Sequence, residues 1–495
     1  MTEHFDVLVV GAGLYGVGAA FWLQKLCPGK TFAIIEARER KGGTWDLFRY
    51  PGIRSDSDMF TLGYAFKPWT DAKAIADGHS ILRYIEETAR ENGIDGKIRY
   101  SQRMVEACWS SADARWTVEV DTPQGRKQYA CGFLYMCSGY YRYDRGYRPD
   151  FAGIADYRGQ IVHPQAWPQD LDYKDKRVIV IGSGATAMTI VPEIARTAAH
   201  VTMAQRSPTY VVARPSKDSV ADWLRATLPA GAAYRLARWK NVLFGMYFYN
   251  LCKRKPDKVK AYLLKLVREQ LPAGYDVEKD FTPRYNPWDQ RLCLIADGDL
   301  FGAIRENRVS VATGEIERFT QTGLRLAGGR EIEADIVVTA TGLELQMLGG
   351  ASLVVDGRKV EPGKTLNYKG MMFSDVPNMA ATFGYTNASW TLKADLIGQY
   401  VCRILNLMDA KGQKIVVPHN DDPDMPTERF VDFSSGYFQR VIDQLPKQGA
   451  RKPWKLHQNY AKDLLALRYG TVEDGVLGFS NPPAAAAVGK EMETA

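Results

Sequence analysis

The sequence predicts an α/β protein in which two parallel-sheet units follow one another along the chain. Two glycine-rich stretches carry this prediction, VVGAGLYG (residues 9–16) and VIGSGATA (residues 180–187). Each follows a short apolar strand and precedes a helical pattern, the arrangement that cradles a pyrophosphate at a helix N-terminus. At 495 residues the chain is also long enough for several domains. We therefore expect two Rossmann-like dinucleotide-binding domains, with a helical insertion in the second.

The first unit contains every part of a dinucleotide site. Residues 6–10 read as a buried strand, GAGLYG supplies the turn, and residues 31–35 read as a second strand that ends at Glu36. Glu36 stands twenty positions after Gly16, about where an acidic side chain accepts hydrogen bonds from a ribose. This spacing predicts the adenosine of FAD or NAD. The alternative is a tight strand–helix turn that binds nothing.

The second unit differs at the corresponding position. Residues 177–181 and 200–204 read as its first two strands, and Arg206 stands nineteen positions after Ala187. A cation there would meet the 2′-phosphate of NADP, which a carboxylate would repel. The second unit therefore favours NADPH, unless Arg206 is only a solvated surface residue.

Residues 42–56, GGTWDLFRYPGIRSD, read as an irregular loop with unusually large side chains. Such a loop belongs more often to a site than to a linker, although a packed surface loop has a similar composition. Further along, we expect a helix at 78–92, strands at 97–105 and 115–120, and a buried strand at 133–136. A crossover between the units should follow at 140–147. Later strands are expected at 309–312, 323–326, 336–341 and 378–383, and a helix at 391–408.

Residues 213–280 break this α/β rhythm, being helical in pattern and rich in basic and aromatic residues. Leu263, Leu264, Val267 and Leu271 form an apolar stripe there. A helical lid that caps the second unit explains this pattern. A basic amphipathic helix can also lie on a membrane surface, but we favour the lid. The predicted division is 1–145 and 344–480 for the first domain, 146–212 and 285–343 for the second, 213–284 for the insertion, and 481–495 for a disordered tail.

Composition narrows the class of protein. A formal net charge of +7 suits anionic cofactors and does not indicate a nucleic-acid binder. The seven cysteines are scattered without a CxxC motif, so we expect no disulfide framework, no metal site and a reducing compartment. The N-terminus enters a strand at once, and the longest apolar run, at 242–252, is about half of the ~20 residues that a spanning helix needs. We expect a cytoplasmic protein, and the sequence indicates no oligomeric state.

Taken together, the motifs resemble the type I Baeyer–Villiger monooxygenases, which are class B flavoprotein monooxygenases, in the subgroup of the ethionamide-activating enzyme. GAGLYG, GGTWDLFRYPGIRSDSD, CSGYY, IGSGATA, QRSPTY, YNPWDQRLC, GYTNASWTLKADL and LPKQG fall in the family's order from end to end. The family fingerprint FxGxxxHxxxW(P/D) appears as Tyr157, Gly159, His163, Trp167 and Pro168, with tyrosine in place of phenylalanine. We interpret His163 as a structural latch between domains.

The resemblance implies two cofactors and a set of residues that contact them. FAD would be held by Gly11, Gly13, Tyr15, Gly16, Glu36, Gly43, Thr44, Trp45, Asp46, Asp56 and Met104. NADPH would be held by Arg54, Ser55, Gly182, Ser183, Gly184, Ala185, Thr186, Ala187, Arg206 and Ser207. Many relatives carry a lysine that also reads the 2′-phosphate, where this chain has Gln290. The helix at 391–408 would direct its N-terminus at the reduced flavin.

The implied reaction is NADPH-driven conversion of a ketone to an ester or lactone by O₂ through a C4a-peroxyflavin, with oxidation of thioethers as well. Arg291 would stabilise negative charge on activated oxygen, and Asp56 would orient Arg291. The nearest alternative is a flavin monooxygenase that acts mainly on sulfur or nitrogen. A pyridine nucleotide–disulfide reductase would need paired cysteines, and residues 37–107 contain none. A non-catalytic nucleotide sensor is a further alternative.

Overall fold

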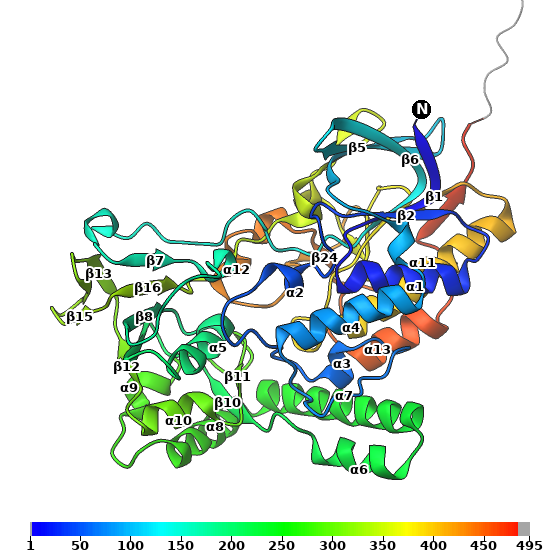
Figure 1. The fold of residues 1–495 in the computed structure, drawn as a ribbon. Helices are drawn as coiled ribbons and strands as arrows, with labels where there is room; N and C mark the ends of the chain where they lie inside the picture. Colours follow the sequence, from blue (N-terminus) through cyan, green and yellow to red (C-terminus); the bar gives the residue numbers. More distant parts are fainter. Residues whose placement is uncertain (1, 484–495) are drawn as a thin grey trace, which may run out of the picture.

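The computed structural model describes residues 2–483. Most of the tail predicted to be disordered, from residue 484 onward, lies outside the described residues. The fold is α/β and contains two parallel-sheet units side by side, which Figure 1 shows in blue to cyan and in green. The predicted fold class is confirmed.

The first unit is a nine-stranded sheet in the order β18-β17-β4-β5-β6-β1-β2-β3, with β21 also paired to β6. Its centre is parallel, because β1 (Glu3–Val10) pairs with both β2 (Phe32–Ile35) and β6 (Gly125–Met136). Val7, Leu8 and Val9 have no exposed surface, as expected for a strand covered on both faces. The other strands are β3 (Ile98–Arg99), β4 (Arg103–Ser110), β5 (Arg115–Thr122), β17 (Ser352–Val355), β18 (Arg358–Lys359) and β21 (Met379–Ala381).

Helices cover the first sheet. Helix α1 (Leu14–Leu26) follows the first glycine turn and packs against α11 (Trp390–Lys411), while α4 (Gly78–Glu91) lies beside α1. The strand expected at 97–105 is two strands, because β3 pairs with β2 whereas β4 pairs with β5. Strands β4, β5 and β6 form an antiparallel meander, and the buried strand expected at 133–136 is the end of the longer β6. Another expectation was wrong: the loop at 42–56 contains a one-turn helix, α2 (Thr44–Leu47). The turn forms because the amides of Leu47 and Phe48 donate to Gly43 and Thr44.

The second unit is a five-stranded, fully parallel sheet in the order β12-β9-β8-β16-β7. The strands are β7 (Gln160–Val162), β8 (Arg177–Ile181), β9 (His200–Gln205), β12 (Val309–Thr313) and β16 (Ile336–Thr339), and α5 (Ala185–Ile194) follows β8. Strand β7 lies at the edge of the sheet and belongs to the stretch 157–168. Strands β13 (Ile316–Phe319), β14 (Gly323–Leu326) and β15 (Glu331–Glu333) form a separate antiparallel sheet.

The helical segment does not simply cap the second unit, which corrects the expectation from the sequence. Helices α8 (Pro256–Gln270) and α9 (Val277–Phe281) do pack there, with Leu264, Val267 and Phe281 in its core. Helices α6 (Ser219–Thr227) and α7 (Ala230–Arg254) instead pack on the first unit, where Tyr234 and Ala237 join its core. Figure 1 shows α7 running beneath α3 (Met59–Leu62), away from the second sheet.

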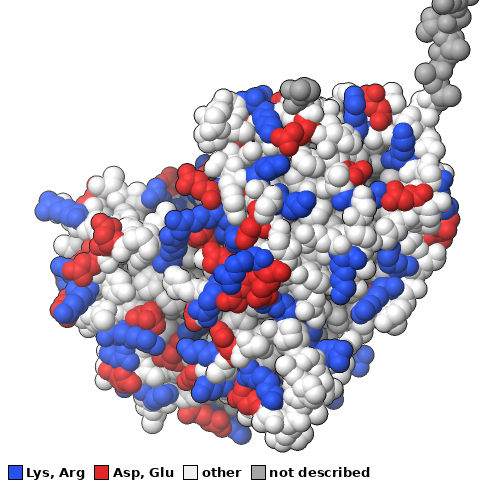
Figure 2. All heavy atoms as spheres, turned by 45° about the vertical axis from the view of Figure 1, so that its right-hand side comes forward, with Lys and Arg blue, Asp and Glu red and all other residues white. Residues whose placement is uncertain are grey.

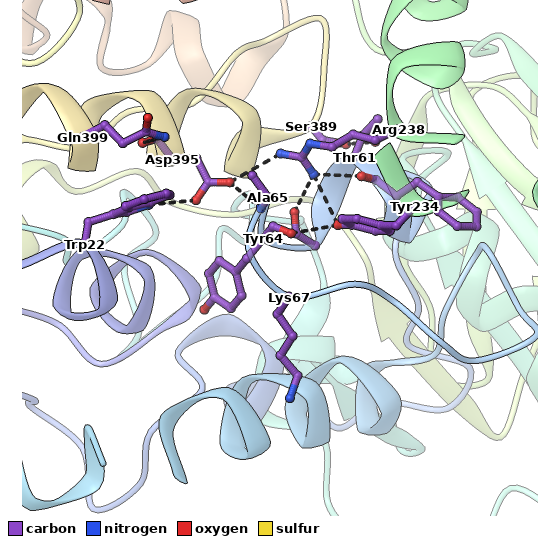
Figure 3. Close-up of polar contacts among 12 residues, drawn as sticks. Trp22, Thr61, Tyr64, Ala65, Lys67, Tyr234, Arg238, Ser389, Asp395 and Gln399 are labelled. Carbon is purple, nitrogen blue, oxygen red and sulfur yellow. Dashed lines mark hydrogen bonds and ion pairs between the residues drawn. The ribbon is translucent and has the colours of Figure 1, made fainter. Parts of the chain in front are cut away.

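The position of α7 depends on a buried cation. Arg238 Nη1 donates to the carbonyl oxygens of Phe60 at 2.8 Å and Gly63 at 2.7 Å, and Tyr234 Oη donates to Tyr64 O at 2.8 Å. Figure 3 shows the Arg238 guanidinium pointing from α7 toward Tyr64 and Asp395. The helical pattern of 213–280 could not indicate which unit would supply these acceptors. Domain boundaries at 145, 212, 284 and 343 stay predictions.

Two further features of the fold concern membrane-spanning helices and metal sites. Within residues 2–483, no helix is both long and apolar enough to cross a membrane. In the same part of the chain, His, Cys, Asp and Glu side chains do not gather in groups of three or more that could hold a metal ion.

Candidate functional site

A cavity of about 570 Å³ lies where the two units meet, and many of the predicted cofactor residues line it. Its lining combines the first glycine turn, the loop around 42–57, the crossover at 137–144, the start of α5 and the start of α11. The predicted residues in the lining are Gly11, Gly13, Tyr15, Glu36, Gly43, Thr44, Trp45, Arg54, Ser55, Asp56, Met104, Ala185, Thr186 and Arg291. Residues distant in sequence therefore share one site.

The first glycine turn has the geometry of a phosphate cradle. Gly11 has a φ of +104°, and a Cβ there would lie 2.7 Å from the Cys137 carbonyl oxygen, so only glycine fits. Gly16 is not part of the cavity lining. It packs directly against the turn, since a Cβ on it would lie 1.8 Å from the Gly11 carbonyl oxygen. Helix α1 begins after Gly13, and no described side chain caps it. Its first amides are therefore available to an anion.

Glu36 lies at the end of β2, as its spacing predicted, and is buried. Its Oε2 accepts from the Ala12 amide at 2.7 Å, and its Oε1 accepts from the Arg38 amide at 3.0 Å. Burial raises the pKa of Glu36, although the two amides oppose this shift. The carboxylate is therefore held rigidly at the cavity wall, in position to accept further hydrogen bonds.

Asp46, which was predicted to contact FAD, is not part of the cavity lining. Its side chain is 3 % exposed and forms ion pairs with Arg38 at 2.7 Å and Arg49 at 3.1 Å. Asp46 lies in the first turn of α2 and anchors that turn. The sequence could not distinguish it from Thr44 and Trp45, because the one-turn helix that rotates it inward was not expected.

Arg291 and Asp56 form an ion pair inside the site, with Nη1 and Oδ2 2.6 Å apart. Burial alone would lower the pKa of Arg291, but the Asp56 carboxylate together with the surrounding tyrosines outweighs burial and raises it, so the guanidinium stays charged. Both side chains keep about a third of their surface exposed, 30 % for Arg291 and 32 % for Asp56. A fixed cation therefore faces open space.

A second cavity, of about 320 Å³, adjoins the first at this ion pair. Asp56, Ser57, Arg291 and Leu294 line both cavities. The second cavity runs between α7 and the segments 387–392 and 457–462, and its walls combine apolar and aromatic side chains with polar and charged ones. Asp58 and Asn241 also line it, and Asn241 Nδ2 donates to Asp58 Oδ1 at 3.0 Å. Thus α7, which sequence reasoning assigned to a cap, forms one wall of the site.

The predicted NADPH residues fall into two groups. Arg54, Ser55, Ala185 and Thr186 line the large cavity. Gly182, Ser183, Gly184, Ala187, Arg206 and Ser207 lie outside its lining, around the turns after β8 and β9. The two turns touch, since Ser183 Oγ donates to the Ser207 carbonyl oxygen at 3.2 Å. Arg206 and Ser207 are exposed at this edge.

Two buried polar atoms fit a bound cofactor. Tyr15 Oη and Arg54 Nη2 are buried, yet have no hydrogen-bond partner among the described residues. Arg54 Nη1 already donates to Asp299 Oδ2 at 2.6 Å, and Arg54 lines the cavity. Unpaired buried donors are uncommon in folded proteins and indicate missing partners. The residues present therefore fit a polar ligand with anionic groups.

Sequence reasoning missed several lining residues. Tyr141 and Tyr143 belong to the stretch read only as a crossover, and Gln102, Gln346 and Trp390 were assigned no role. Burial raises the pKa of Tyr143 to about 12, and its Oη lies 3.4 Å from Thr44 Oγ1. The cluster of tyrosines after CSG was the available signal. His163 lies elsewhere: a Cβ on Gly146 would lie 1.8 Å from its ring, so the two segments interlock closely.

Comparisons with known proteins agree with this geometry. Residues 70–227 match the family described as flavin-binding monooxygenase-like, and residues 9–72 match the NAD(P)-binding Rossmann-like domain. The FAD-containing monooxygenase EthA of Mycobacterium tuberculosis (strain ATCC 25618 / H37Rv) is 54% identical over 489 residues, which cover 99% of this chain and 100% of that protein.

The chain belongs to the FAD-containing monooxygenases. The resemblance to the class B flavoprotein monooxygenases is thereby confirmed. This monooxygenase is also similar to the probable FAD-binding monooxygenase AlmA of Acinetobacter baylyi (strain ATCC 33305 / BD413 / ADP1), at 47% identity over 97% of each chain.

Solved structures share the fold of this monooxygenase. An oxidized steroid monooxygenase bound to NADP has a TM-score of 0.78 at 22% identity, covering 97% of this chain and 100% of the other. An open form of cyclohexanone monooxygenase has a TM-score of 0.71 at 19% identity, covering 85% and 91%. Membership of the FAD-containing monooxygenases and the NAD(P)-binding domain at residues 9–72 agree with the predicted cofactors, FAD and NADPH. All seven of its cysteines are free in the structure.

Proposed function

We propose that this monooxygenase carries out Baeyer–Villiger oxidation, converting a ketone to an ester or lactone with NADPH and O₂, and that it also oxidises thioethers. The observation that carries the proposal is the Arg291–Asp56 ion pair at the junction of the two cavities. The larger cavity fits the nucleotide cofactors, and the smaller one fits an organic substrate. The pair lies where the two would meet.

Each of the two sheet units would bind one of the two cofactors. The first glycine turn would hold the FAD pyrophosphate on the α1 amides, and Glu36 would accept the ribose hydroxyls. The turns after β8 and β9 would hold NADPH, with Arg206 against the 2′-phosphate. When bound, FAD reduced by NADPH supplies activated oxygen.

Arg291 would stabilise negative charge on the reacting oxygens. A guanidinium remains protonated at any working pH, and its several N–H groups can follow charge as it moves from oxygen to the former carbonyl oxygen. Asp56 accepts one of these N–H groups and so holds the guanidinium in one orientation. Asp56 also keeps Arg291 from forming an ion pair elsewhere.

The smaller cavity would bind the ketone and keep water away. Val242, Phe248, Tyr249 and Leu392 contribute apolar surface to its walls. An apolar wall beside a fixed cation strengthens the electrostatic interaction, because little water is present to screen it. A neutral carbonyl compound whose apolar part packs against these four side chains would suit this cavity.

Product analysis tests this proposal. The FAD-loaded enzyme should be incubated with NADPH, ¹⁸O₂ and an equimolar mixture of a ketone and a thioether. One labelled oxygen should enter each ester or sulfoxide, the second should leave as water, and one NADPH should be oxidised for each molecule of ester or sulfoxide formed. Sulfoxide without ester would instead favour a monooxygenase of sulfur or nitrogen.

An Arg291→Ala variant tests the assigned residue. We expect ester formation to fall by about a hundredfold or more, as on loss of a single oxyanion donor. FAD absorbance and flavin reduction by NADPH under anaerobic conditions should be retained. Ester formation near the wild-type rate would contradict the role of Arg291.

A further inference from the structure

Helix α7 carries a second apolar stripe that faces solvent. Its buried face contains Tyr234, Ala237 and Arg238, whereas Leu236, Trp239, Leu243 and Tyr247 are 39–65% exposed. The spacing of three, four and four residues places these four side chains on one helix face. Helix α6 adds Val220 and Trp223, with Leu228 just after its end. Apolar residues gathered in this way mark an interaction surface.

The segment that contains α6, α7 and α8 has a higher net positive charge than the complete chain. Residues 214–270 contain thirteen Lys or Arg and four Asp or Glu, a net charge of +9, against +7 for the complete chain. Lys217, Arg235, Arg254, Lys255 and Lys258 are exposed there. Figure 2 shows positive and negative side chains interspersed over most of the visible face.

The stripe adjoins the smaller cavity. Phe244 is 50% exposed and also lines that cavity. The ring of Trp239 lies 5.7 Å from the ring of Tyr460, which is part of the cavity wall as well. The cavity therefore reaches the surface beside the stripe.

We propose that the exposed stripe of α6 and α7 docks this monooxygenase on an anionic lipid bilayer, with α7 lying in the plane of the interface. Trp and Tyr side chains prefer the level of the lipid head groups, Leu and Val insert below it, and Lys and Arg attract anionic lipids. A second copy of the chain fits the surface poorly, because two segments of charge +9 would face one another. The sequence alone favoured a packed lid; the exposed stripe supports the membrane contact.

Docking would place the entrance of the smaller cavity at the bilayer, so that a lipophilic ketone could enter without crossing water. This consequence rests on the proposed function. The docking itself does not, because it depends only on the surface of α6 and α7.

Vesicle flotation tests the docking. The full-length, FAD-loaded protein should float with vesicles of phosphatidylcholine and phosphatidylglycerol in equal parts, and much less with vesicles of phosphatidylcholine alone. Adding salt should release it, since the attraction to anionic lipid is screened. The triple variant Leu236→Ser/Leu243→Ser/Tyr247→Ser should lower the bound fraction about tenfold.

The matched control is Tyr262→Ser, which removes an equally exposed aromatic side chain from α8. Its flotation should equal that of the wild type, and both variants should oxidise NADPH with a water-soluble ketone at the wild-type rate. Failure of the wild type to float with anionic vesicles would overturn the proposal, as would unchanged flotation of the triple variant. The wild type could instead self-associate without vesicles, and the triple variant could lose this self-association. That result would overturn the membrane proposal and show that the stripe binds a second copy of the chain.

Discussion

Arg238 and Asp395 form an ion pair that joins α7 to α11, with Nη2 and Oδ2 3.4 Å apart and side chains only 7% and 5% exposed. Asp395 Oδ2 also accepts from the Ala65 amide at 2.7 Å, and Oδ1 accepts from Trp22 Nε1 at 3.3 Å. The pair therefore ties the helical segment to α1, α11 and the loop after α3 (Figure 3). It fixes the helix that forms one wall of the smaller cavity.

Replacing Arg238 should destabilise the fold strongly. Arg238→Met removes the cation and leaves Asp395 and two carbonyl groups buried without it, at a cost of about 3–5 kcal/mol. Denaturant unfolding of the FAD-loaded protein measures this loss. Arg235→Met, one turn away on the exposed face, should change the free energy of unfolding by less than about 0.5 kcal/mol.

The loss in Arg238→Met should also depend on pH. Burial raises the pKa of Asp395, and Arg238 opposes that shift, so its removal should raise the pKa further. A raised pKa in the folded state gives stability that is present at low pH and is lost as pH rises through it. The variant should therefore gain stability relative to the wild type on acidification. A loss that stays constant with pH would contradict an unpaired Asp395.

Gly16→Ala should prevent FAD binding. The new Cβ would lie 1.8 Å from the Gly11 carbonyl oxygen, so the turn must open and the α1 amides must move. The yellow FAD absorbance of the purified protein should be lost. Gly29→Ala is the control, because no atom lies within 4 Å of its Cβ position. Full FAD content in Gly16→Ala would show that the turn tolerates the displacement.

Arg206→Ala should weaken the preference for NADPH over NADH. The exposed guanidinium at the end of β9 is the proposed partner of the 2′-phosphate, which NADH lacks. A charged hydrogen bond of this kind contributes about 1.5–3 kcal/mol, so KM for NADPH should rise roughly tenfold to a hundredfold, with KM for NADH unchanged. Arg196→Ala, an exposed arginine after α5, should affect neither. An equal rise in KM for NADPH and NADH would show that Arg206 does not recognise the 2′-phosphate.

The Asp218 carboxylate should stabilise α6 and α7 at neutral pH, and this stabilisation should be lost in acid. Its Oδ1 caps α6 at the Ala221 amide, 3.1 Å away, and accepts from Lys240 Nζ at 2.6 Å. Burial would raise the pKa of Asp218, but Lys240 and the cap outweigh burial and lower it. A lowered pKa gives stability that is present above the unfolded value, near 3.8, and is lost as pH falls through the folded value.

Asp218→Asn keeps a capping oxygen but removes the charge. It should be about 1 kcal/mol less stable than the wild type at neutral pH, and the difference should vanish below the folded pKa of Asp218. Thermal unfolding across this range measures it. Asp222→Asn, whose more exposed carboxylate pairs with Arg225 on the same helix, should show little of this pH dependence. A difference that persists in acid would mean that the charge contributes nothing.

The sequence alone determined the parts of this protein that depend on neighbours in the chain. The two glycine turns, their strands and helices, and the place of Glu36 follow from local sterics and from spacing over about twenty residues. The motif resemblance indicated Arg291 and Asp56 as partners, and the structure brings them to 2.6 Å.

The tertiary structure decided what depends on contacts between distant segments. Arg291 and Asp56 are 235 positions apart, and α7 meets α11 through Arg238 and Asp395, which are 157 apart. Whether Asp46 faced the cavity depended on a one-turn helix, and whether α7 covered one unit or the other depended on buried acceptors supplied by Phe60 and Gly63. A helical pattern shows that a face will be buried, but the partner is chosen by packing and by the need to pair every buried charge.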